Sequence, residues 1–229
     1  MLFQITVTDS LSTVQNAVSG EISLKWWEMA LKGGWIMIPI AVLSVIAVFI
    51  FIDRYLAIRK AQKIDNNFMD RIKEYIHEGR IDSATAMCKS TDNPVSKMIL
   101  KGINRIGHPL NDVSTAIENV GKLEVYKLEK NLPTLATVAG AAPMIGFLGT
   151  VIGMIRAFYD MSQVAGGNVD IQLLSDGIYT AMVTTVAGLL VGIVAYLAYN
   201  MLVAKVEKVV FNLEATTTEF MDLLNEPAN

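Results

Sequence analysis

Three long runs of residues without a charge constrain this chain more than any other feature of its sequence. They cover 35–52, 133–155 and 177–203. A helix needs roughly 20 apolar residues to cross the hydrocarbon core of a bilayer, so each run is long enough to cross it once. The mean hydropathy of +0.42 is unusual for a soluble domain of this size. The sequence therefore predicts an all-α, polytopic membrane protein with three transmembrane helices and long cytoplasmic helical extensions.

The positively charged residues predict the orientation of these helices. Fourteen of the 19 Lys and Arg residues lie between Arg54 and Lys130, and cytoplasmic segments of membrane proteins carry an excess of both. We therefore expect a cytoplasmic helical domain at 53–132 and a cytoplasmic helical tail at 204–229. The N-terminal segment 1–34 and the loop 156–176 then face the periplasm. The run "SLKWWEMALKGGW" at 23–35, all but its last residue within 1–34, predicts an interfacial helix, or else an ordinary aromatic belt beside the first span.

The expected cytoplasmic residues read as amphipathic helices separated by helix-ending residues. Gly79 and Gly107 are expected to end two of them, and Pro94 stands where a helix begins. Asp112 is expected to be the N-cap of a further helix that runs toward the second span. The tail carries a seam of residues spaced alternately by three and four, which predicts a coiled coil between chains or a packing stripe within one chain. The seam comprises Val203, Val206, Val210, Leu213, Thr217, Phe220 and Leu224.

The residue types that usually carry catalysis or hold a metal are scarce. His77 and His108 have no Cys or His partner at metal-ligand spacing, so surface positions are expected for both. The single Cys, Cys88, is expected to be a small buried apolar residue. The glycine-rich stretches lie inside the spans, where a phosphate-binding loop has no role. We therefore expect no enzyme activity, no cofactor, no metal site and no nucleic-acid partner.

Small residues recur at helical spacing in the second and third spans. Because lipid tails are as apolar as Leu, membrane helices associate through close packing, and small residues permit that approach. The spacing predicts tight contacts of these two helices, either within one chain or between copies. The bulky first span is expected to face lipid. Since three such helices cannot enclose a pore alone, a ring of copies is expected. The expected packing residues are Gly146, Gly149, Gly153, Gly188 and Gly192.

Hydroxyl groups stand among these small residues, while the second and third spans contain no Asp, Glu, Lys or Arg. We expect Thr150, Thr180, Thr184 and Thr185 to line an ion pathway. The alternative for each is a hydroxyl bonded to a carbonyl of its own helix. Proton relays in membranes normally use ionisable side chains. If ions cross here, another chain is expected to supply the carboxylate.

The run "KNLPTLATVAGAAPMIGFLGTVIGMIRAF", the loop after it and "GIYTAMVTTVAGLLVGIVAYLAYN" resemble the signature region of the MotA/TolQ/ExbB proton-channel family, nearest to its ExbB branch. The resemblance extends from Trp35 to about Val206. It implies a pentamer of this chain in the bacterial cytoplasmic (inner) membrane. It also implies two copies of an ExbD-like single-span partner in the central pore, whose Asp carries the proton. A TonB-like protein would take the work to outer-membrane transporters.

The same resemblance assigns roles to the threonines. Thr150 and Thr185 match the pore threonines of the second and third helices of the family. Thr180 stands where many ExbB chains have Glu, so this chain departs from the pattern there. The pair Thr184 and Thr185 is similar to that of sodium-driven flagellar relatives, whereas many proton-driven relatives keep Ala at the first position. A proton is expected ahead of sodium.

Several alternatives stay open at this point. Within the branch, a TolQ-like motor for envelope integrity and a gliding or secretion motor fit the same residues. In a different class, a small-solute transporter would show inverted repeats and broken helices, which the sequence does not suggest. A membrane scaffold would explain the packing but would leave the threonines without a role.

Overall fold

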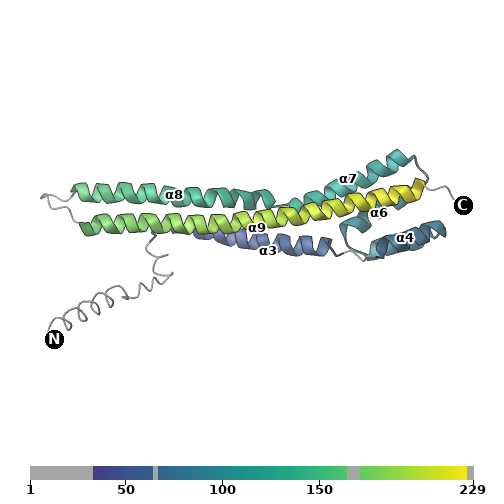
Figure 1. Cartoon of the computed structure of the whole chain (residues 1–229), viewed down its shortest axis with the longest axis horizontal. Helices are drawn as coiled ribbons and strands as arrows, with labels where there is room; N and C mark the ends of the chain where they lie inside the picture. Colours follow the sequence, from purple (N-terminus) through teal and green to yellow (C-terminus); the bar gives the residue numbers. More distant parts are fainter. Residues whose placement is uncertain (1–32, 64–66, 164–170, 226–229) are drawn as a thin grey trace, which may run out of the picture.

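A computed structural model describes residues 33–63, 67–163 and 171–225, and of 171–173 only the backbone. The elements in these residues are all helices, and they form an elongated bundle (Figure 1). Three helical segments are long and apolar enough to cross a membrane. The predicted all-α fold with three membrane-spanning helices and long helical extensions is therefore confirmed. The predicted interfacial helix around Trp26 and Trp27 lies outside the described residues.

Three long helices form the apolar part of the bundle. They are α3 (Met37–Ala61), α8 (Leu132–Gln163) and α9 (Ile171–Asn225). Figure 1 shows α8 and α9 side by side along the length of α8, with α3 along the other side of α9. The helices α8 and α9 each contain one predicted span and continue beyond it, and α3 contains the first span from residue 37 onward and continues beyond its end. The predicted loop at 156–176 is accordingly helical at both ends, and its middle, 164–170, lies outside the described residues.

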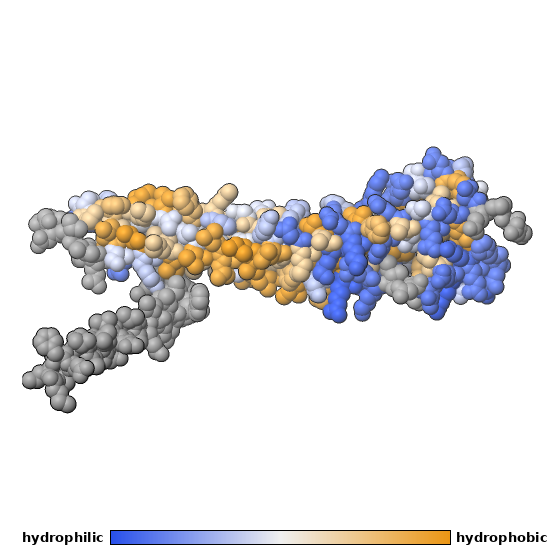
Figure 2. All heavy atoms as spheres, in the orientation of Figure 1, coloured by the Kyte–Doolittle hydropathy of each residue, from blue (hydrophilic) through white to orange (hydrophobic). Residues whose placement is uncertain are grey.

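Four shorter helices form a group beside the last part of α9. They are α4 (Phe68–His77), α5 (Ile81–Ser90), α6 (Pro94–Ile103) and α7 (Leu110–Glu129). The helices α4, α6 and α7 contact α9, and α5 packs on α4 and α6. We call these four helices, together with α9 from residue 204 onward, the helical body. Figure 2 shows that its surface is largely hydrophilic, whereas the surface over α8, α3 and the first part of α9 is largely hydrophobic. The chain thus divides into a membrane part and a polar part, as the sequence predicts.

Local sequence signals determine where the short helices begin and end. Gly79 and Gly107 have φ angles of 70° and 96°, a conformation that glycine adopts without steric cost, and both follow helices as predicted. Pro94 is the first residue of α6, and the Asn93 side chain accepts a hydrogen bond of 2.8 Å from the backbone N–H of Ser96. The N-cap prediction for Asp112 was wrong. The helix α7 begins two residues earlier, and Asp112 lies in its first turn, where its negative charge interacts favourably with the helix dipole.

The core of the helical body forms where α9 crosses α6 and α7. Phe220 and Ile117 are fully buried, and a Cβ on Gly102 would stand 2.6 Å from the Phe220 ring and 2.8 Å from Ile117 Cδ1. Gly102 therefore lets the three helices approach closely. The tail seam packs against these helices of its own chain, with Val206, Leu213 and Phe220 buried. The described residues thus support the packing-stripe alternative.

A chain of ion pairs ties the end of α3 to α6 and α7. Asp92, in the turn before α6, lies 2.8 Å from Lys60 and 3.3 Å from Lys97. Lys97 in turn lies 3.2 Å from the nearly buried Glu124, which also pairs with Lys127 at 2.6 Å. The hydrogen bond from Lys60, followed by that from Lys97, lowers the pKa of Asp92. These contacts fix the membrane helix α3 to the polar helices beside it.

Candidate functional site

The contact between α8 and α9 is backbone against backbone. A Cβ added to Gly188 would stand 2.5 Å from the carbonyl oxygen of Ala142 and 2.9 Å from Gly146 Cα. A Cβ on Gly153 would stand 2.9 Å from the Ala181 Cβ. Real Cβ atoms essentially never come within 3.0 Å of another heavy atom, so the helices can meet this closely only because these positions are glycine.

The five glycines predicted for packing all lie in this one contact. Gly146 faces the backbone of Thr184, Thr185 and Gly188, Gly149 faces the side chain of Thr184, and Gly192 faces the ring of Pro143. Packing within one chain thus accounts for the recurring glycines of both the second and the third span. The glycines hold the α8–α9 hairpin together and by themselves say nothing about contacts between copies.

Thr184 lies inside the hairpin contact. Its residue is 1% exposed, and its hydroxyl donates a hydrogen bond of 2.8 Å to the carbonyl of Ala181, one turn earlier in α9. A Cβ on Gly149 would stand 2.7 Å from the Thr184 Cβ, and Gly33, before α3, approaches the same side chain. In the single chain the Thr184 hydroxyl is therefore bonded to a carbonyl of its own helix, which is the alternative to a place in the ion pathway.

Thr185 and Thr150 come together at the edge of the same contact. Their hydroxyl oxygens are 3.5 Å apart, and the Thr185 hydroxyl donates a hydrogen bond of 3.1 Å to the carbonyl of Gly146. The Thr150 hydroxyl donates to the carbonyl of Phe147 in its own helix. Both residues are half-buried, so their oxygens are reachable from one side. We call Thr150 and Thr185 the hydroxyl pair.

Thr180, the remaining predicted pathway residue, is half-buried on α9, more than one turn before Thr185. It lies next to Ala181, which packs against Gly153. The structure therefore places the four threonines along one stretch of the hairpin but brings only the hydroxyl pair into direct contact.

The hydroxyl pair can bind a water molecule or a cation, but its hydroxyls do not ionise and so cannot take up and release a proton. A Thr hydroxyl offers one donor and two acceptor lone pairs, so two of them can hold a water molecule or contribute oxygens to a cation. The predicted spans that contain them have no ionisable side chain of the Asp, Glu, Lys or Arg type. A group that takes up and releases a proton at this depth would have to come from another molecule.

Large apolar side chains cover the outer face of α8. Met144, Phe147, Ile155 and Phe158 are each more than half exposed in the single chain. In a membrane such a face meets lipid or other protein helices rather than water, because exposing it to water would be unfavourable. The hairpin thus offers further membrane helices a broad surface beside the hydroxyl pair.

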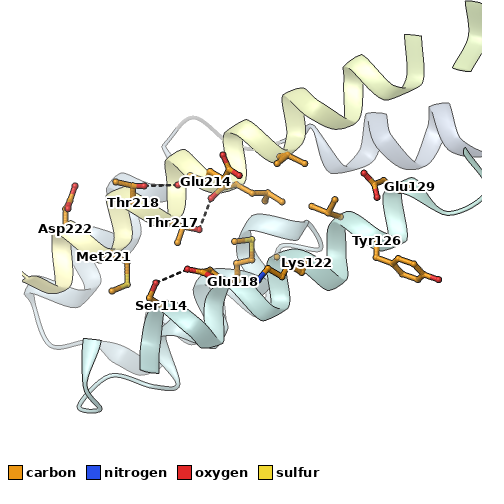
Figure 3. A pocket seen from close by; sticks show the side chains of 15 residues that line it. Ser114, Glu118, Lys122, Tyr126, Glu129, Glu214, Thr217, Thr218, Met221 and Asp222 are labelled. Carbon is orange, nitrogen blue, oxygen red and sulfur yellow. Dashed lines mark hydrogen bonds and ion pairs between the residues drawn. The ribbon is translucent and has the colours of Figure 1, made fainter. Parts of the chain in front are cut away.

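A groove between α7 and α9, which sequence reasoning missed, runs along the helical body (Figure 3). Its volume is about 760 Å³. Figure 3 shows Ser114, Glu118, Lys122 and Tyr126 at successive turns of α7 along one side. Their spacing of four was the signal available in the sequence, but that pattern is equally typical of a solvent-facing stripe. Glu214, Thr217, Thr218, Met221 and Asp222 line the other side, on α9.

The remaining sequence candidates lie away from both features. His77 and His108 are exposed, as predicted, and Cys88 is buried, as predicted. Burial raises the pKa of the Cys88 thiol to about 11, so the thiolate form is scarce at neutral pH. Among the residues that the structure describes, no cluster of three His, Cys, Asp or Glu side chains could hold a metal ion.

Comparison with known proteins agrees with this arrangement. The model of the MotA/TolQ/ExbB proton channel family matches residues 90–215. A biopolymer transport protein ExbB homolog of Methanothermobacter thermautotrophicus is 29% identical over 189 residues, which cover 82% of this chain and 66% of that protein. The Tol-Pal system protein TolQ of Pseudomonas aeruginosa is 26% identical over 201 residues, covering 83% of this chain and 86% of the relative. The biopolymer transport protein ExbB of Aquifex aeolicus is 38% identical over 104 residues, covering 44% and 69%. The matched residues include the α8–α9 hairpin and the hydroxyl pair.

Proposed function

Because this chain belongs to the MotA/TolQ/ExbB proton channel family, we propose that it is an ExbB-like stator and channel subunit of a motor in the bacterial inner membrane. The motor uses the ion motive force, with protons ahead of sodium as the ion, and passes the work to a TonB-like protein for transport across the outer membrane. The N-terminus is periplasmic, and the helical body and C-terminus are cytoplasmic.

The proposed assembly is a homopentamer around a pore. In it α8 and α9 of each copy line the pore, and α3 faces the membrane lipids. Two copies of an ExbD-like single-span protein occupy the pore and supply the carboxylate that this chain's own second and third spans lack. The exposed apolar face of α8 and the tightly packed hairpin support this arrangement, because each copy then presents one rigid pair of helices to its neighbours.

The hydroxyl pair is the observation that carries the proposal. Two half-buried hydroxyls in contact, within a charge-free part of a membrane hairpin, form a polar position that a partner carboxylate can use. We assign Thr150 and Thr185 to the ion pathway, where they orient water beside that carboxylate. Thr180 lies further along the same hairpin and belongs to the proposed pathway as well. Thr184 is assigned a packing role, since its hydroxyl is enclosed between the helices.

A TolQ-like motor is the second candidate, and one observation favours it. The similarity to TolQ of Pseudomonas aeruginosa extends over 86% of TolQ, whereas the similarity to the ExbB homolog of Methanothermobacter thermautotrophicus extends over 66% of that protein, with nearly equal coverage of this chain. Expressing the chain in cells that lack either ExbB or TolQ distinguishes the two. Restored TonB-dependent uptake supports the first candidate, and restored envelope integrity supports the second.

Substituting the hydroxyl pair tests the ion pathway itself. Val has nearly the shape of Thr but no hydroxyl, so Thr150→Val and Thr185→Val remove the oxygens and preserve the packing. We expect both variants to assemble to the same size, measured by native mass spectrometry, and to lose ion-driven work. The matched control is Thr137→Val, because the Thr137 hydroxyl is exposed on the same helix and donates to the carbonyl of Pro133.

Full activity of both pair variants would exclude the threonine pathway. Activity of the wild-type motor after the sodium gradient is removed supports protons, and loss of activity supports sodium. Thr184→Ala tests the assignment of this residue: if its hydroxyl were an oxygen ligand of a sodium site, the variant would lose sodium-driven activity. Under the packing role that we assign to Thr184, this variant stays active with protons as the driving ion.

A further inference from the structure

A trough runs along the membrane part between α3 and α9. Three small side chains form its floor, of which Ala47 and Ala195 are buried. Larger apolar side chains form its walls, and its volume is about 330 Å³. The floor is formed by Ala47, Ala195 and Ala198, and the walls include Val48, Leu190 and Leu197.

The length of the trough matches one leaflet of a bilayer. On α9 it extends from Leu190 to Met201, which at 1.5 Å per residue is about 16 Å. Half of a hydrocarbon core of roughly 30 Å has the same length. The trough therefore has the dimensions and the apolar lining of a site for one acyl chain.

A positive charge and an aromatic ring lie at the end of the trough nearest the helical body. The Lys205 ammonium is 5.1 Å from the centre of the Tyr55 ring, and Tyr55 contacts Phe51, which lines the trough. Lys205 stands one helical turn beyond Met201, just past the end of the predicted span at residue 203. None of the ion pairs among the described residues uses Lys205. By contrast, Arg54 nearby is held by Asp53 and by the carbonyl of Lys127.

We propose that this trough binds a phospholipid of the leaflet nearest the helical body, with one acyl chain between α3 and α9 and the phosphate at Lys205. The apolar acyl chain matches the lining of the trough, and the anionic phosphate matches the positive charge of Lys205. Basic positions between membrane helices are typical headgroup sites. The lipid fills the space that the small residues leave between α3 and α9. It thereby forms part of the contact that holds the sparsely buried helix α3 to the hairpin.

A photoreactive lipid tests the site in the full-length protein. The chain is reconstituted in phosphatidylcholine liposomes that contain phosphatidylglycerol with a diazirine in its acyl chain. Adducts are mapped by mass spectrometry, and those in the trough are compared with those on the exposed face of α3 around Val45 and Phe49, which lie outside the trough. We expect adducts to concentrate on Val48, Leu190 and Leu197, whereas a lipid that only surrounds the protein labels both surfaces alike.

Charge variants then test the headgroup contact. Lys205→Ala is expected to lower the labelling ratio of the trough to the exposed α3 face roughly fivefold, which corresponds to about 1 kcal/mol for one Lys beside a membrane surface. Lys205→Arg should restore it. Lys208→Ala is the matched control, because Lys208 is an exposed residue on the same helix and its loss changes the net charge equally. Equal effects of Lys205→Ala and Lys208→Ala would overturn the proposal.

A second variant tests the tail without touching the charge. Ala198→Phe fills the floor of the trough, so trough adducts should fall while labelling of the exposed α3 face around Phe49 stays unchanged. Unchanged trough labelling in this variant would show that the acyl chain lies elsewhere and would overturn the proposal. Absence of trough adducts in the wild type, as when a second protein chain covers the trough, would overturn it too. None of these outcomes depends on ion-driven activity.

Discussion

A single methyl group added at Gly188 tests the packing of the α8–α9 hairpin. In Gly188→Ala the new Cβ stands 2.5 Å from the carbonyl oxygen of Ala142 and 2.9 Å from Gly146 Cα. Both neighbours are backbone atoms in a helix, so no side-chain rotation can relieve the overlap. The two helices must separate locally instead.

The size of this separation follows from the contact distances. Ordinary van der Waals contact of a Cβ begins at 3.4 Å, so the 2.5 Å contact requires a local movement of about 0.9 Å. A gap of that size forfeits a quarter to a half of the attraction of each contact that it opens. Over-packing of this kind typically costs about 1 to 3 kcal/mol. In membranes, close packing is a main source of helix association, so little else compensates.

The assay compares the unfolding free energy of purified variants in mixed micelles titrated with a denaturing detergent, with helicity as the signal. Gly140→Ala is the matched control, because Gly140 lies in α8, the other helix of the hairpin, and a Cβ there would meet nothing within 4 Å. Both substitutions carry the same gain in helix propensity, roughly 1 kcal/mol, so their difference isolates the overlap. Gly153→Ala should fall between them, since its nearest contact is the Ala181 Cβ at 2.9 Å. Equal stability of Gly188→Ala and Gly140→Ala would refute the packing argument.

Three further predictions concern the helical body. The pKa of Asp92 is lowered mainly by its hydrogen bond from Lys60. The contribution of Asp92 to the free energy of unfolding is therefore present above the ordinary Asp pKa of 3.8 and is lost as pH falls through the lowered pKa. Asp92→Asn should reduce stability at neutral pH but not in strong acid, measured by unfolding at both pH values. Glu124→Gln should cost about 1.5 kcal/mol of unfolding free energy, because two Lys residues bond to this nearly buried carboxylate. Glu118→Gln, whose ion pair is exposed, should change little. Cys88 should react slowly with maleimide at neutral pH, because burial raises its pKa to about 11. The control is Ser90→Cys in a Cys88→Ser background, which should react fast because position 90 is exposed. Equal reaction rates would contradict the burial of Cys88.

The spans and the helix ends could be predicted because their causes are local. A long run without charge is stable across a bilayer as a helix whatever lies beside it. Gly79 follows the C-cap of α4, and Gly107 lies in the turn between α6 and α7; both have a positive φ, a conformation that favours glycine. Asp112 shows the limit of this reasoning. An acidic residue suits both the N-cap and the first turn of a helix. Because Pro109 occupies the N-cap position of α7, Asp112 falls in the first turn.

The ion pairs of the helical body could not be predicted, because they join residues that are far apart in the sequence. Asp92 bonds to Lys60 on α3 and lies near Lys97, which reaches Glu124 on α7. The sequence contains many Lys and acidic residues at helical spacing, and spacing alone favours pairs within one helix. Which helices pack side by side decides the actual partners, and that information lies in the core around Gly102 rather than in the charges.

The hydroxyl pair shows most clearly what spacing leaves open. Thr184 and Thr185 are adjacent and chemically identical, but 3.6 residues per turn places them on faces about 100° apart. The spans are apolar on all sides, so no polar face reveals which of the two points toward the neighbouring helix. Gly149 resolves this in the structure, because the space that it leaves on α8 holds the Thr184 side chain. The next residue, Thr185, is thereby rotated to the edge of the contact, where it meets Thr150. The glycine therefore determines which hydroxyl is enclosed by packing and which remains available to an ion.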